Sequence, residues 1–198
     1  MASKVSSRRQ AGAIVESSCR TRFMPQTHSA SATDSKVLAG IYVFCAGFIG
    51  VLMASGYFER EVLRLHLFQS LIYVAVAWLS RRRSKWGYAI GIAVATEWNA
   101  YNLFVSNFIR AGFHQLQLLI YEGRVTHPSL LFGAVAGVDH FGLLACLIWA
   151  YARLPNKRFS DSFIFLGGAI LVSAYFFGII ALLWPQFLAR LMAHFFKA

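Results

Sequence analysis

The sequence contains five apolar runs, each close to the roughly 20 residues that a helix needs to cross a bilayer. They cover approximately residues 37–57, 62–80, 86–108, 129–152 and 162–184. All four prolines fall outside these runs, so no predicted helix is interrupted by a residue that lacks a backbone N–H. The pattern predicts an all-α fold, a polytopic membrane helix bundle with five transmembrane helices.

The composition excludes an ordinary soluble domain. Hydrophobic residues make up 58% of the chain and charged residues 14%, and the mean hydropathy is +0.54. The net charge of +11 would suggest nucleic acid as a partner in a soluble protein, but here the basic residues stand in blocks beside apolar runs. We therefore interpret them as topology signals, with the lipid bilayer as the partner and no nucleic acid bound.

The distribution of basic residues predicts an orientation. With five spans, thirteen of the nineteen Lys and Arg fall on the side of the N-terminus. The six on the other side are Arg60, Arg64, Arg110, Arg124, Arg190 and Lys197. Positive charge favours the inner side of a membrane, so we expect the N-terminus inside and the C-terminus outside. The membrane is a bacterial inner membrane or an organelle membrane.

Three segments lie outside the predicted spans. Residues 1–36 are basic, rich in Ser and without apolar periodicity, which predicts a disordered tail. Its first 23 residues are interpreted as a targeting leader, as sequence before a true start at Met24, or as a plain tail. Residues 107–123 and 185–198 are amphipathic and predict interfacial helices.

The third apolar run carries the most unusual residues of the chain. It contains Glu97, Asn99 and Asn102, and a carboxylate within a membrane span usually faces the bundle interior or a wet cavity. Trp98 lies beside Glu97, whereas the other four Trp residues stand near the ends of predicted spans. We expect this run to be the central helix.

Two other runs add polar residues. In the second run His66, Gln69 and Tyr73 repeat at helical spacing and share one stripe. In the fourth run Asp139 and His140 follow a Gly133-xxx-Gly137 motif, which allows another helix backbone to approach closely.

The expected depth of these residues decides which can meet. At a rise of about 1.5 Å per residue, Tyr73, Glu97 and His140 fall at one level near the middle of the bilayer. Gln69 and Asn102 fall closer to the outer side. The residues predicted to bind a ligand or relay protons are Glu97, His140, Tyr73, Asp139, His66, Gln69, Asn99 and Asn102.

Several more specific functions fit the sequence poorly. A haem between two histidines needs them at one level, but His66 and His140 differ in expected depth by about 9 Å. No HExxH or paired ExxH spacing indicates a metal, and no GxSxG indicates a nucleophilic hydrolase. The three cysteines form no CxxC and no Cys/His metal pattern. We predict no metal and name no cofactor.

Three hypotheses about function remain open. The polar residues bind a small or amphiphilic ligand or relay protons. Alternatively, they satisfy one another, and the protein is an accessory or scaffold subunit, as a homo-oligomer or in a larger membrane complex. In the third hypothesis Glu97 and His140 are the acid–base pair of a lipid-processing membrane enzyme. The sequence leaves open whether the chain is an enzyme.

Overall fold

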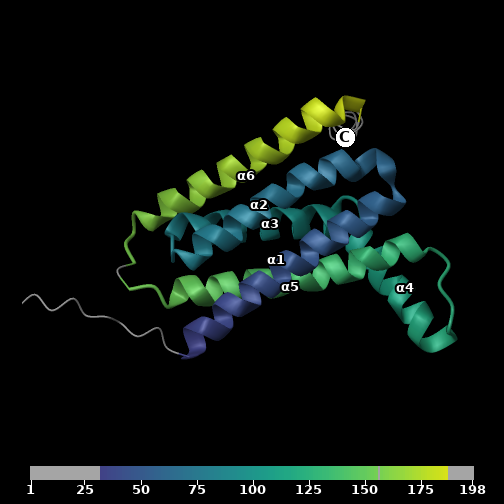
Figure 1. The fold of residues 1–198 in the computed structure, drawn as a ribbon, viewed down its shortest axis with the longest axis horizontal. Helices are drawn as coiled ribbons and strands as arrows, with labels where there is room; N and C mark the ends of the chain where they lie inside the picture. The colour runs from purple at the N-terminus through teal and green to yellow at the C-terminus, as the bar shows by residue number, and fades with distance from the viewer. Residues whose placement is uncertain (1–31, 156, 187–198) are drawn as a thin grey trace, which may run out of the picture. The chain divides into compact units, whose positions relative to one another are not determined.

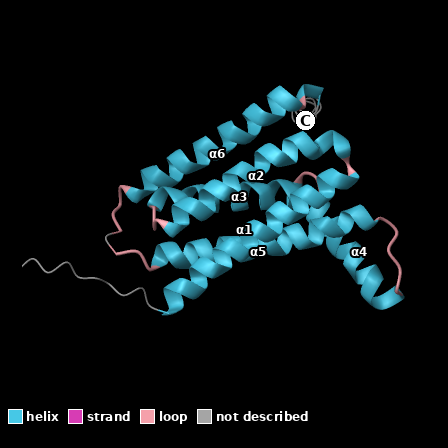
Figure 2. Cartoon of the chain, in the orientation of Figure 1, coloured by secondary structure: helices cyan, strands magenta, loops and turns pink. Residues whose placement is uncertain are grey.

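The computed structural model describes residues 32–155 and 157–186, and all regular structure in these residues is helical (Figure 2). The elements in chain order are α1 (Ala32–Phe58), η1 (Arg60–Val62), α2 (Leu63–Arg81), α3 (Lys85–Phe104), α4 (Phe108–Glu122), η2 (Pro128–Leu130), α5 (Leu131–Ala152) and α6 (Asp161–Leu183). The predicted all-helical fold is therefore confirmed for the described residues.

Four of the described helical segments are long and apolar enough to cross a bilayer. They are Asp34–Phe58, Arg60–Arg81, Pro128–Ala152 and Asp161–Leu183. These helices indicate a membrane protein, but α3 is not among them, so the structure supports four of the five predicted spans.

The different composition of α3 follows from its position. It packs against α2, α4, α5 and α6, and half of its residues are buried, including Asn99 and Asn102. In α6, by contrast, only Asp161, Gly168, Val172 and Ile179 are buried. A helix surrounded by other helices faces protein instead of lipid, and it therefore tolerates polar side chains that a lipid-facing helix excludes.

Two predicted boundaries were wrong by a few residues. α1 begins at Ala32, so residues 32–36 belong to a helix and not to the predicted tail. Asp34 in its first turn suits the positive end of the helix dipole. α3 ends at Phe104, and Asn107 (φ 57°) turns the chain into α4. Residues 1–31 and 187–198, which hold most of the predicted tail and C-terminal helix, lie outside the described residues.

The α4 helix packs against α5 through glycines. An added Cβ at Gly112 would lie 2.3 Å from the Ala134 backbone nitrogen, and one at Gly133 would lie 2.4 Å from the Phe108 carbonyl oxygen. The close approach predicted at Gly133 is therefore present, and α4 is the neighbour. Figure 1 shows α4 at an angle to α5. Its interfacial location stays a prediction.

Ion pairs join the helices at one end of the bundle. Asp34 at the start of α1 lies 3.1 Å from Arg83 Nη2 and 3.9 Å from Arg153 Nη1. Lys85 Nζ lies 2.7 Å from both carboxylate oxygens of Asp161. The α2–α3 and α5–α6 connections thus meet the start of α1 at the left end in Figure 1.

We predict that Gly133→Ala destabilises the protein. Alanine normally favours a helix over glycine by about 1 kcal/mol, but here its methyl group would force α4 away from α5. The expected net loss is about 1–3 kcal/mol, as for other overpacked sites, and thermal unfolding in detergent measures it. Gly50→Ala is the control, because no atom lies within 4 Å of an added Cβ there. A melting temperature for Gly133→Ala equal to that of Gly50→Ala would contradict the tight α4–α5 contact.

Candidate functional site: a cavity above Trp98

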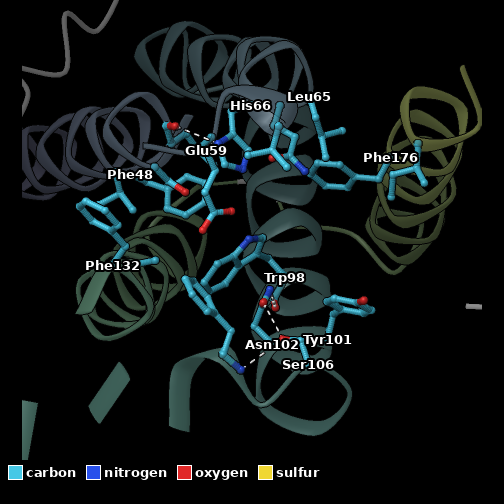
Figure 3. A pocket seen from close by; sticks show the side chains of 18 of the residues that line it. Phe48, Glu59, Leu65, His66, Trp98, Tyr101, Asn102, Ser106, Phe132 and Phe176 are labelled. Atoms are coloured by element: carbon cyan, nitrogen blue, oxygen red, sulfur yellow. Dashed lines mark hydrogen bonds between the residues drawn. The ribbon is translucent and has the colours of Figure 1, made fainter. Parts of the chain in front are cut away.

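A cavity of about 520 Å³ opens at the end of the bundle opposite the basic connections. α1, α2, α3, α5 and α6 contribute most of its wall, and Phe108 at the start of α4 also lines it. Figure 3 shows the labelled side chains converging on it, with Phe48 from α1, His66 from α2, Trp98 from α3, Phe132 from α5 and Phe176 from α6. Its wall is mainly apolar and aromatic, with a small number of polar groups, which is typical of small-molecule sites.

The side chains at the inner end of the cavity pack against a buried histidine, His140. Trp98 and Phe48 line the cavity, and both also contact His140, which is fully buried. The Trp98 ring stacks on the imidazole with a centroid distance of 4.1 Å and an interplanar angle of 5°. The Phe48 ring meets the imidazole edge-on at 4.0 Å. His140 therefore supports the cavity from below and does not line it.

Hydrogen bonds fix the orientation of the His140 ring. Nδ1 lies 2.9 Å from the Ala136 carbonyl oxygen, and Nε2 lies 2.7 Å from the Tyr73 hydroxyl. A carbonyl oxygen only accepts, so Nδ1 carries a proton and donates it to Ala136. In the neutral ring Nε2 then accepts from the Tyr73 hydroxyl. Both ring nitrogens are engaged, and the side chain joins α2 to α5.

Glu97 lies in the cavity wall and not beside His140. It is half-buried, and Ser173 Oγ of α6 donates a hydrogen bond of 3.0 Å to its Oε1. Both residues line the cavity. The three residues expected at one level, Tyr73, Glu97 and His140, therefore do not form one cluster. Tyr73 and His140 form a hydrogen-bonded pair on the far side of Trp98 from the cavity, and Glu97 lines the cavity.

The outer polar residues also line the cavity; the hydrogen bond of His66 joins α2 to α1, whereas those of Asn102 are local. His66 Nδ1 donates to the Leu52 carbonyl oxygen at 2.9 Å. The Asn102 amide donates to the Trp98 carbonyl oxygen at 2.9 Å and accepts from Ser106 Oγ at 2.9 Å. Asn102 and Gln69 thus share the cavity wall, and the bonds of Asn102 stabilise the end of α3.

Besides Tyr73 and His140, two more of the predicted site residues lie outside the cavity wall. Asn99 is 5% exposed, and neither of its amide atoms has a hydrogen-bond partner. Asp139 lies against α1, where its Oδ1 is 2.8 Å from the position of a Cβ on Gly47. Its Oδ2 is buried without a partner. These residues belong to helix contacts, and their predicted role in a ligand or proton site is not supported by contact with the cavity.

Sequence reasoning missed several residues that shape the cavity. Ser173 is the partner of Glu97, Glu59 lines the cavity from the α1–α2 connection, and Phe48 lies against His140. Trp98 carried a signal, because it was the one Trp away from the predicted span ends. Ser173 carried none, because the contact between α3 and α6 depends on how the two helices are rotated.

We predict that Tyr73→Phe destabilises the protein while keeping its shape. The variant retains the ring that lies 4.6 Å from Phe48, but it leaves Nε2 of a fully buried histidine without its partner. An unpaired buried polar group costs about 1–3 kcal/mol. For a chain of this size each kcal/mol lowers the melting temperature by roughly 2–4 °C. Tyr42→Phe is the control, because Tyr42 is 37% exposed on α1. Equal melting temperatures for the two variants would show that the Tyr73–His140 bond contributes nothing.

Comparisons with protein-family models, with curated proteins and with solved structures found no match to this chain.

Proposed function

We propose that this chain is a multi-pass membrane protein that binds a small amphiphilic ligand in the cavity above Trp98. The observation that carries the proposal is the cavity itself, with a volume of about 520 Å³ and a wall to which all six α-helices contribute. Binding sites for small molecules have volumes of about 300–1,000 Å³, and a few polar groups in an apolar wall fix the orientation of the ligand. Glu97, Gln69 and His66 are such groups here.

In this proposal α3 is the fifth membrane-spanning helix. Its 20 residues correspond to about 30 Å of helix, the thickness of the hydrocarbon core. Its neighbours α2, α5 and α6 separate much of it from lipid. The cavity then opens toward the outer side, because it lies at the end opposite the basic connections.

The contacts of His140 favour ligand binding over a proton relay or acid–base catalysis. A relay needs a continuous chain of hydrogen bonds, whereas Glu97 bonds to Ser173 and His140 bonds to Tyr73 and Ala136. The Trp98 and Phe48 rings stand between His140 and the cavity. A substrate in the cavity would reach Glu97 but not His140, so the two are poorly placed to act as an acid–base pair.

A scaffold function is the second candidate, and one contact favours it. Ser173 gives Glu97 a partner across α3 and α6, and buried polar pairs of this kind hold helices in register within a membrane. A scaffold needs no occupied cavity. Occupancy of the cavity therefore separates the two functions.

Native mass spectrometry of the protein released from lipid nanodiscs tests the proposal. We expect the wild-type protein to retain a bound small molecule, and Ser55→Phe to lose most of it, because half-buried Ser55 lines the cavity and a phenyl ring there takes up space that the ligand needs. Ala145→Phe is the control, since Ala145 is exposed on α5 and is not part of the wall. Retention of the same molecule at the same occupancy in Ser55→Phe would favour the scaffold.

A further inference from the structure

The charged side chains that line the cavity are acidic, although the chain as a whole carries a positive net charge. Glu59 and Glu97 line the cavity, and no Lys or Arg does so among the residues that the structure describes. The chain carries 19 Lys and Arg against 8 Asp and Glu. A wall with two carboxylates and no basic side chain is therefore the reverse of what this composition would give on average.

Three arginines near this end of the bundle are held elsewhere, and Arg64, exposed at the start of α2, is not part of the cavity wall. The Arg60 guanidinium lies over the Tyr57 ring at 4.9 Å, and the Arg110 guanidinium lies 5.8 Å from the centre of the Phe104 ring. Arg124 forms an ion pair with Glu122. Tyr57, Phe104 and Glu122 are not part of the cavity wall. These three arginines thus stack or pair outside the cavity and leave Glu59 and Glu97 facing it.

Glu97 and His66 offer hydrogen-bond acceptors to a ligand, and Gln69 adds an amide that both donates and accepts. A carboxylate accepts at both oxygens, and Ser173 donates to Oε1 of Glu97, so acceptor capacity is left for a ligand. His66 donates through Nδ1 to Leu52, which makes Nε2 an acceptor in the neutral ring. The rings of Trp98 and Tyr101 also line the cavity, and aromatic rings attract cations.

We propose that the ligand of this cavity is a lipophilic organic cation, whose positive group lies between Glu97 and Glu59 and whose apolar body lies among the aromatic side chains. The inference rests on the proposed function, because it names the ligand class of that site. A carboxylate within an apolar bundle is costly without a counter-charge, and a bound cation supplies one. Glu59 is exposed at the mouth and Glu97 is half-buried deeper in the wall, so the cation first meets Glu59.

Two ions of equal size and opposite charge test this inference. Tetraphenylphosphonium and tetraphenylborate share a shape, and their binding is measured by equilibrium dialysis against the protein in nanodiscs of zwitterionic lipid, after subtraction of binding to empty nanodiscs. We expect saturable binding of the phosphonium at least 10-fold tighter than that of the borate. The net charge of +11 favours the opposite order, so a preference for the cation must come from the cavity.

Variants in which a carboxylate is replaced by a carboxamide test which residues cause the preference for the cation. Glu97→Gln keeps an acceptor for Ser173 and is expected to weaken phosphonium binding about 10-fold or more, with a smaller loss in Glu59→Gln because Glu59 is exposed. Glu61→Gln is the matched control, since Glu61 is an exposed neighbour that does not line the cavity. It should bind as the wild-type protein does. Melting curves establish that each variant is folded.

The outcomes separate this inference from the proposed function. Equal binding of both ions, lost in Ser55→Phe, would overturn the cation preference and leave the cavity as a binding site. Phosphonium binding that survives both Glu97→Gln and Glu59→Gln would overturn the role of the carboxylates. Failure of both ions to bind would overturn the ligand class, while a small molecule retained in native mass spectra would still support the proposed function.

Discussion

The buried imidazole of His140 joins four helices, and the cavity depends on it. The side chain comes from α5, the Tyr73 hydroxyl reaches it from α2, the Trp98 ring stacks on it from α3, and the Phe48 ring makes a T-shaped contact with it from α1. In an apolar interior each ring nitrogen needs a partner, which fixes the rotation and depth of these helices. The same contacts hold Trp98 and Phe48 in place as the inner surface of the cavity.

The position of α3 links the fold to the proposed function. Because four helices pack against it, it carries Glu97, Asn99 and Asn102, which would be costly in a helix exposed to lipid. Glu97 lies on the side that faces the cavity and α6, whereas Asn99 is buried without a hydrogen-bond partner. The predicted span that is not among the four long apolar helices is thus the one that supplies Glu97 to the proposed site.

Apolar run length predicted the helices of the described residues to within a few positions, because covering about 30 Å of hydrocarbon is a strong constraint. Helical rise placed Tyr73 and His140 at one level, and they form a hydrogen bond. The partner of Glu97 was not predictable, since depth does not specify which neighbouring helix a side chain faces. Packing of Gly112 against Ala134 was also missed, because an amphipathic pattern does not distinguish an interfacial helix from one docked on the bundle.

The central claim is that the space above Trp98 admits an amphiphile, and Trp98 fluorescence tests it most directly. A protein whose other four Trp residues are changed to Phe reports on Trp98 alone, and a brominated amphiphile quenches indole fluorescence only at close range. The account predicts quenching that saturates with amphiphile concentration in nanodiscs and that is lost in Ser55→Phe. Quenching that rises without saturation, and equally in Ser55→Phe, would mean that the quencher acts from the lipid phase and would contradict an accessible cavity.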